Sequence, residues 1–97
     1  MGWQIVFSTR SRQDLQRIVE FIARDNPTAA ERFGLALIDQ AESLANAPEI
    51  GVRMPERPSA RFFPFGAYLI IYRADTARQT LRVLRFWHGA RGKRPLR

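Results

Sequence analysis

The N-terminal part of the chain changes from an alternating to a helical spacing of apolar residues. Trp3, Ile5 and Phe7 occupy every second position, which predicts a short first strand with one more apolar face. A helix is expected to begin at Ser11, because its hydroxyl can cap the first turn while Asp14 completes a capping box. The buried face of this helix is predicted from a stripe formed by Leu15, Ile18, Val19 and Ile22.

A second helix follows after a short connection. Asn26 and Pro27 end the first helix and suit the N-cap and first position of the next one, although Thr28 with Glu31 offers a competing capping box. So short a connection forces the two helices into an antiparallel hairpin. Its second apolar stripe is formed by Phe33, Leu37, Ala41 and Leu44.

The remaining chain is predicted to form strands after an irregular segment. Residues 46–60 contain three prolines and Gly51, which favours a loop or an irregular strand edge. Strands are then expected at residues 61–65, 68–72 and 80–87, with turns at residues 66–67 and 75–79. In the last strand, the alternation predicts Leu81 and Val83 on one face, and on the other Arg82, Leu84 and Phe86.

These elements predict one α+β domain over residues 1–97. The order β-α-α-β-β-β is that of a small antiparallel β-sheet with an N-terminal helical hairpin packed on one face. The basic tail from residue 89 is expected to be loosely held, and the opposite face of the sheet to stay open. We expect basic residues to gather on that face or at its rim, namely Arg61, Arg73, Arg82 or Arg85, His88 and Arg91.

Composition excludes several classes of protein. With 45% hydrophobic and 26% charged residues, the chain has the usage of a folded domain. It has no cysteine and a single histidine, so we expect neither a metal site nor a cofactor. No apolar run approaches the roughly 20 residues of a membrane helix, and the N-terminus lacks the pattern of a signal peptide. A cytoplasmic protein without membrane contact is predicted.

Charge is distributed unevenly between the two halves. Residues 1–48 hold five Arg against six Asp or Glu, a net charge of −1. Residues 49–97 hold ten Arg and one Lys against three acidic residues, a net charge of +8. Such a field attracts phosphate polyanions or an acidic protein partner. The preference for Arg over Lys suits bidentate contacts to either, although a GC-rich genome would produce the same preference.

The order of short motifs resembles the RelE/ParE toxins of bacterial type II toxin-antitoxin systems, and more closely the ParE, or plasmid-stabilisation, branch. The resemblance covers nearly the whole chain and depends on the order of the motifs, since none is specific alone. It includes Ile22-Ala23 before Asp25-Asn26-Pro27, then Ala29-Ala30-Glu31-Arg32-Phe33, Leu44-Ala45, Ile71-Tyr72, Val83-Leu84-Arg85, and the closing His88-Gly89-Ala90-Arg91. The resemblance implies a growth-inhibiting toxin that forms a hetero-oligomer with a cognate antitoxin.

Two activities occur within this superfamily. The ParE-like branch poisons DNA gyrase by binding, whereas the RelE-like branch cuts messenger RNA on the ribosome. Our prediction is the ParE-like activity, with the RelE-like endoribonuclease as the alternative. A non-toxic basic binding module is a third possibility, because uneven charge alone would serve it.

Metal-free RNA cleavage would require proton-transfer groups and cations. His88 is the side chain whose ordinary pKa suits proton transfer at neutral pH, and Arg61, Arg85 and Arg91 could neutralise the phosphate. A second proton-transfer group is not obvious, because we expect both tyrosines to lie in a buried strand and the tail has none. In the ribonuclease branch a tyrosine, or a histidine with a tyrosine beside it, often lies near the C-terminus, whereas here Gly89 follows His88. Both departures favour binding over cleavage.

Each candidate also has a structural interpretation. His88 could hydrogen-bond backbone at the end of a strand and shape the following turn, and Arg61 or Arg85 could be solvated or pair with a helix carboxylate. Trp3 and Trp87 are more typical of core or antitoxin contacts than of base stacking. For a toxin that acts by binding, the predicted contact residues are Arg61, Arg82, Arg85, Trp87, Arg91, Lys93 and Arg94.

Overall fold

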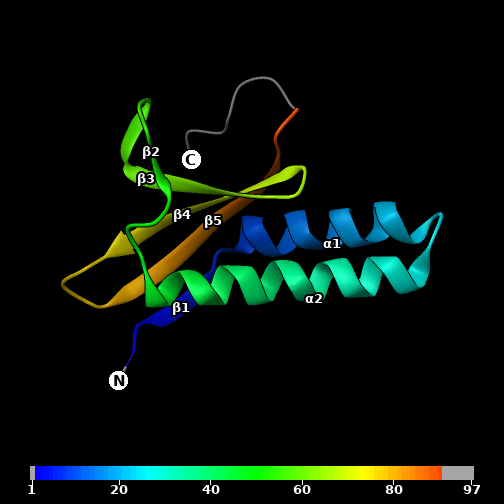
Figure 1. Cartoon of the computed structure of the whole chain (residues 1–97), viewed down its shortest axis with the longest axis horizontal. Helices are drawn as coiled ribbons and strands as arrows, with labels where there is room; N and C mark the ends of the chain where they lie inside the picture. Colours follow the sequence, from blue (N-terminus) through cyan, green and yellow to red (C-terminus); the bar gives the residue numbers. More distant parts are fainter. Residues whose placement is uncertain (1, 91–97) are drawn as a thin grey trace.

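The computed structural model describes residues 2–90. Two long antiparallel helices lie along one face of a twisted sheet, and both connect to it at the end where the N-terminal strand lies (Figure 1). The α+β prediction, with a helical hairpin on one face of the sheet, is confirmed. The elements are β1 (Gln4–Phe7), α1 (Thr9–Ala23), α2 (Pro27–Ser43), a short 3-10 helix (Leu44–Asn46), β2 (Val52–Met54), β3 (Arg57–Phe65), β4 (Tyr68–Asp75) and β5 (Thr80–His88).

The sheet is mixed and does not contain antiparallel pairs alone. Its strand order is β1-β5-β4-β3-β2, in which β2 to β5 form an antiparallel meander. β1 pairs in parallel with β5, with Ile5 opposite Leu81 and Phe7 opposite Val83. A short hairpin turn can join only antiparallel strands, but β1 is separated from the meander by the two helices. It is therefore free to pair with β5 in the parallel direction. This parallel pair corrects the wholly antiparallel sheet that the sequence predicted.

The first helix begins two residues earlier than predicted. Ser8 is its N-cap, and its hydroxyl accepts a hydrogen bond from the Ser11 N–H at 3.0 Å. Ser11 is buried, and its own hydroxyl donates back to the Ser8 carbonyl at 2.8 Å. The predicted capping box at Ser11 is therefore wrong, because Asp14 faces the sheet. The predicted cap of α2 is confirmed, since the Asn26 side chain accepts from the Ala29 N–H at 3.0 Å.

The proline-rich segment forms an irregular strand edge. It contains β2 and the first residues of β3, so β3 begins four residues before the predicted position. The ladder shifts register between Arg53 and Met54, and residues 58–60 lie in the irregular part of the pairing. A proline has no N–H group to donate to a regular ladder, so Pro58 is tolerated in this irregular part of the pairing. Both alternatives that the composition left open are observed, because residues 47–51 form a loop and residues 52–60 form the irregular strand edge.

Two apolar clusters lie on opposite faces of the sheet. The larger cluster packs between the helices and the sheet, and its fully buried members include Leu37, Tyr72, Leu81 and Val83. The smaller one lies on the other face, where Phe62, Leu69, Leu84 and Trp87 pack against Met54, Ala60 and Ile71. No helix within residues 2–90 is long and apolar enough to cross a membrane.

A bulge in β5 changes which residues share a face. Opposite Ile71 and Tyr72 the register shifts, so that Ile71 pairs with Arg85 while Tyr72 pairs with Val83. Leu84 is the extra residue, and it belongs to the cluster away from the helices. Beyond it, Phe86 returns to the helix side beside Leu81 and Val83. The predicted placement of Phe86 on the same face as Leu84 is therefore wrong, because strict alternation fails at a bulge.

Candidate functional site

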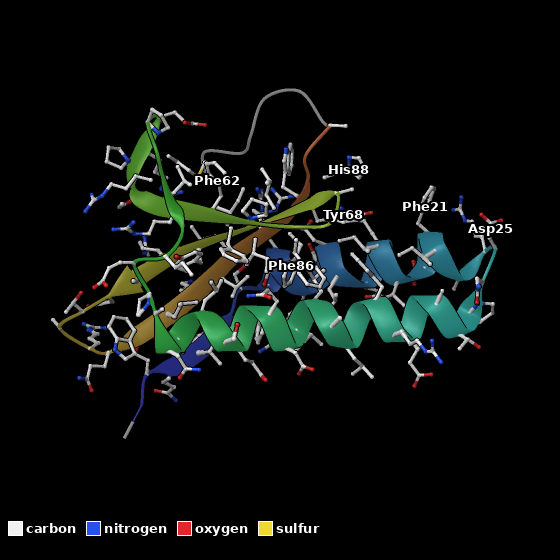
Figure 2. The ribbon with its side chains drawn as sticks, in the orientation of Figure 1. Phe21, Asp25, Phe62, Tyr68, Phe86 and His88 are labelled. Atoms are coloured by element: carbon white, nitrogen blue, oxygen red, sulfur yellow. The ribbon has the colours of Figure 1, made fainter. Side chains whose placement is uncertain are left out.

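A groove lies between α1 and the ends of β4 and β5. It has a volume of about 430 Å³ and combines apolar and polar side chains. Figure 2 shows His88 and Tyr68 together at the end of the sheet, with Phe21 farther along α1. The residues that line it are Asp14, Arg17, Ile18, Phe21, Tyr68, Phe86, His88 and Ala90.

His88 is held at the groove by its neighbours in sequence and across the sheet. Its Nδ1 accepts a hydrogen bond from the Ala90 N–H at 3.1 Å. This bond matches the structural interpretation of His88 as a residue that shapes the turn after β5. Because an accepting ring nitrogen of neutral histidine carries no proton, the proton is on Nε2. In this arrangement the Nε2–H of His88 can donate a hydrogen bond to a ligand. A general base needs a ring nitrogen that is free to accept a proton, and Nδ1 is already occupied.

Tyr68 stands beside His88 and is only half-buried. The two rings meet edge to face, with centroids 5.0 Å apart and an interplanar angle of 83°. They are directly paired across β4 and β5. The expectation that both tyrosines lie buried in the sheet is wrong for Tyr68 and right for Tyr72, which is fully buried. Sequence reasoning missed this pair, although counting outward from the turn after Asp75 brings the two residues to within one position of each other.

Asp14 and Arg85 form a shielded ion pair at the base of the groove. The Arg85 Nε and Nη2 donate to the two carboxylate oxygens of Asp14 at 2.7 and 3.0 Å. The side chains are only 12% and 7% exposed, and the bond to Asp14 raises the pKa of the Arg85 guanidinium above its ordinary value. The prediction that Arg85 could pair with a helix carboxylate is confirmed. A guanidinium so engaged is a poor candidate for neutralising a substrate phosphate.

The same carboxylate completes the edge of β5. β1 pairs only with residues 80–83, so the backbone of β5 beyond Val83 has no strand beside it on that side. Asp14 accepts the Phe86 N–H at 3.0 Å, and the Ser8 hydroxyl donates to the Leu84 carbonyl at 2.8 Å. Side chains of the first turns of α1 thus replace the missing strand, which satisfies backbone groups that would be costly to leave unpaired.

The other predicted cations lie in separate places. Arg61 lies outside the groove, on β3 opposite Tyr72, and its Nη1 donates to the carbonyls of Glu49 and Gly51 at 3.1 and 2.8 Å. Arg82 is exposed between Leu81 and Val83, which face the helices, so it lies on the open face. Trp87 is also on that face, with the Arg85 guanidinium 5.2 Å from its ring centroid. The expectation that these cations and His88 share one face is therefore not met. Arg91, Lys93 and Arg94 lie outside the described residues.

A comparison with known families decides the classification. A family model described as the ParE toxin of the type II toxin-antitoxin system parDE matches residues 5–92. The chain belongs to the ParE toxin family. It is therefore a toxin of the RelE/ParE superfamily, and the resemblance seen in the sequence motifs is confirmed.

This ParE-family toxin is also similar to curated proteins that carry the RelE name. Toxin RelE1 of Caulobacter vibrioides is 32% identical over 91 residues, which cover 92% of this chain and 96% of the relative. Toxin RelE2 of the same organism is 33% identical over 88 residues, covering 91% and 97%. The family model thus carries the ParE name, whereas these two relatives carry the RelE name.

Solved structures show the same fold. The chromosomal ParDE toxin-antitoxin system of P. aeruginosa matches with a TM-score of 0.76 at 16% identity, covering 90% of this toxin and 96% of that chain. The RelBE2 toxin-antitoxin complex of Mycobacterium tuberculosis matches with 0.71 at 23% identity, covering 91% and 99%. The isolated RelE toxin of E. coli matches with 0.58 at 14% identity, covering 95% and 89%. At these identities the likeness establishes the fold alone.

Within residues 2–90 of the toxin, no cluster of three or more His, Cys, Asp or Glu side chains is placed to hold a metal ion. The ionisable groups of the groove are Asp14, Arg17, Tyr68 and His88. Asp14 is already bound to Arg85, so Arg17, Tyr68 and His88 remain as the groups that a ligand could meet. In the sequence Tyr68 was set aside as buried and Arg17 was not among the candidates, because only the packing of α1 against β4 and β5 brings them beside His88.

Tyr72 carries a prediction for the pH dependence of stability. Burial raises the pKa of its hydroxyl above the ordinary value of 10.0, although the hydrogen bond from the Gly51 N–H and the charge of Arg61 oppose this. A raised pKa in the folded state means that the unfolded state loses its proton first. Tyr72 therefore contributes stability that is full below pH 10 and is lost as the pH rises through the folded-state pKa.

We expect the free energy of unfolding of the toxin to fall more steeply above pH 10 than that of Tyr72→Phe. Urea unfolding at several pH values from 8 to 11 would measure both slopes. Below pH 9 the free energies of unfolding of the two proteins should change with pH in parallel, and the variant should be the less stable one in that range. Equal slopes above pH 10 would show that the hydroxyl is not shielded as described.

Proposed function

We propose that this toxin arrests growth by binding DNA gyrase in the cytoplasm and that a cognate antitoxin neutralises it. One observation carries the choice of binding over cleavage. Neither strand arginine considered for phosphate neutralisation is available beside His88, because Arg85 is bound by Asp14 and Arg61 lies outside the groove, where it is bound to backbone carbonyls. Binding a protein by charge and shape requires no free cation beside a proton donor, so the engaged arginines are compatible with it.

The proposed antitoxin is supported by the solved relatives, which include toxin-antitoxin complexes of the ParDE and RelBE2 systems. The groove offers such a partner both apolar surface and charge. Phe21 is 63% exposed on α1, and Arg17 is exposed one helical turn before it. A segment of the antitoxin with apolar side chains and a carboxylate would complement both. The expected assembly is therefore a hetero-oligomer of toxin and antitoxin.

A ribosome-dependent messenger RNA endoribonuclease is the second candidate. It is favoured by the contact between Tyr68 and His88, since the two supply hydroxyl and imidazole groups in one groove with Arg17. Metal-free cleavage of RNA requires two groups able to transfer protons and a cation near the phosphate. Membership of the toxin family argues against the third possibility, a non-toxic basic module.

Supercoiling by purified gyrase is the deciding measurement. We expect the purified toxin to inhibit supercoiling and the antitoxin to relieve that inhibition. His88→Gln and Tyr68→Phe should each retain toxicity, whereas a nuclease would lose about 100-fold or more of its rate on loss of a general acid or base. Arg32→Gln, a substitution at an exposed position of α2, is the control variant and should behave like the natural toxin.

The opposite outcome is equally clear. If supercoiling is unaffected at toxin concentrations that stop growth, translation stops instead, and folded His88→Gln loses toxicity, the endoribonuclease is the correct assignment. Circular dichroism of each variant confirms that a loss of toxicity is not a loss of fold.

A further inference from the structure

A second, larger pocket lies at the opposite end of the sheet from the groove. It has a volume of about 530 Å³ and forms where Trp3, the loop before β2 and the turn between β4 and β5 meet. In Figure 1 this turn lies at the far side of the molecule from the connection between α1 and α2. Three arginines from three strands line it, Arg53, Arg61 and Arg73, together with Trp3 and Ser59.

Arg61 is fixed in this pocket before any ligand arrives. The buried Tyr72 hydroxyl donates to the Pro48 carbonyl at 2.8 Å and accepts the Gly51 N–H at 2.9 Å, which holds the loop against the sheet. The Glu49 and Gly51 carbonyls of that loop then accept both hydrogen bonds from the Arg61 Nη1. A guanidinium has five N–H donors in one plane, so three remain for another acceptor. Holding the side chain in advance lowers the entropy cost of binding.

The pocket has more positive charge than its own carboxylates neutralise. Arg53 and Arg61 are directly opposite each other on β2 and β3, an arrangement of like charges that destabilises a strand pair. Glu49 and Asp75 also line the pocket, but within residues 2–90 neither forms a salt bridge with one of the three arginines. Asp75 instead accepts the Arg78 N–H at 3.1 Å and lies 3.9 Å from the Arg78 Nε. A bound anion would offset this repulsion.

We propose that this pocket binds the phosphate group of a nucleotide. The planar arginine side chains match phosphate oxygens in pairs, and a dianionic phosphate suits several cations better than a single carboxylate does. The half-buried Trp3 provides an aromatic wall on which a base can stack, and Ser59 provides a hydroxyl for the sugar. The volume falls within the range of sites for small molecules.

The proposal is independent of the gyrase assignment, because it is argued from the residues of this pocket alone and none of them lines the groove. The phosphate could belong to a free nucleotide or to the end of a nucleic acid chain, and the two sources share the same contacts. Isothermal titration calorimetry of the full chain at low salt distinguishes the two sources. The probes are AMP, adenosine and a short 5′-phosphorylated oligonucleotide.

We expect AMP to bind saturably and adenosine to bind at least about tenfold more weakly, since a lost charge-assisted hydrogen bond reduces affinity by that order. Arg53→Glu should weaken AMP binding by at least about tenfold, because it removes a cation and adds repulsion. Arg32→Glu makes the same change in net charge on an exposed site of α2 away from the pocket. It should change the affinity by less than about twofold.

The comparison of ligands identifies the source of the phosphate. Tighter binding of AMP than of the oligonucleotide, with mutual competition, assigns a free nucleotide, and the reverse order assigns a nucleic acid end. The proposal is overturned if no phosphate probe saturates the chain or if adenosine binds as well as AMP. It is also overturned if Arg32→Glu weakens AMP binding as much as Arg53→Glu, because the attraction would then be general to the basic surface.

Discussion

Asp14→Ala is expected to lower the free energy of unfolding by about 3–5 kcal/mol, the range measured when one partner of a buried ion pair is removed. The substitution leaves the Arg85 guanidinium, 12% exposed, without its carboxylate. It also leaves the Phe86 N–H without an acceptor. Against a total stability of about 5–15 kcal/mol for a domain, such a loss should be evident in urea unfolding and in the melting temperature.

Two further variants separate the ion pair from a general effect of losing a carboxylate. Asp39→Ala makes the same change at an exposed site on α2, and should alter stability by less than about 0.5 kcal/mol. Replacing both partners, as Asp14→Ala with Arg85→Met, should cost less than the sum of the single changes, because no buried charge is then left unpaired. If Asp14→Ala behaves like Asp39→Ala, then Arg85 is free to bind ligands and the case against phosphate binding at the groove fails.

Local patterns were sufficient to predict most elements of the fold. The apolar stripes of both helices and the cap at Asn26 depend on residues three or four positions apart, a spacing that the sequence displays directly. The strand positions follow from runs of apolar residues between turns. Membership of the toxin superfamily also followed from the order of short motifs along the chain.

Features that depend on distant residues could not be predicted in this way. Asp14 and Arg85 are separated by 71 positions, so nothing local distinguished Asp14 from a helix-capping residue. The bulge at Leu84 reverses the faces of the residues after it, and alternation alone gives no sign of such an extra residue. For the same reason the contact between Tyr68 and His88 was missed, and with it the most specific argument for the alternative function.

The positive charge of the second half also divides in a way that the sequence could not show. Arg85 is neutralised by the first helix, and Arg61 is bound to the loop before β2. Arg53 and Arg73 line the pocket, whereas Arg82 lies on the open face. The uneven charge of the sequence predicts one basic surface, but in the structure some of the arginines are bound within the fold. The others lie in at least two separate places, the pocket and the open face. Contacts with a partner and with a phosphate ligand can therefore be tested independently.

Gly51→Ala is the second substitution expected to have a large effect. A Cβ atom at this buried position would lie 2.5 Å from the Tyr72 hydroxyl, 2.8 Å from its Cε1 and 3.0 Å from the Phe62 carbonyl oxygen. The tyrosine ring is fully buried and cannot move without losing its bonds to Pro48 and Gly51. We expect a loss of about 3 kcal/mol, which combines overpacking with the loss of these bonds. Gly2→Ala is the control, because its Cβ meets no atom within 4 Å.

A double-mutant cycle with Tyr72→Phe tests whether the hydroxyl is the cause. Tyr72→Phe alone should cost about 1–2 kcal/mol, since it removes the donor to the Pro48 carbonyl and the acceptor of a buried N–H. It also removes the atom that would lie closest to the new methyl group, while the contacts with the ring and with Phe62 remain. Adding Gly51→Ala to Tyr72→Phe should therefore cost at least about 1 kcal/mol less than adding it to the natural chain. Additive effects in urea unfolding would mean that the loop is displaced in another way, and that Tyr72 does not hold the carbonyls that position Arg61.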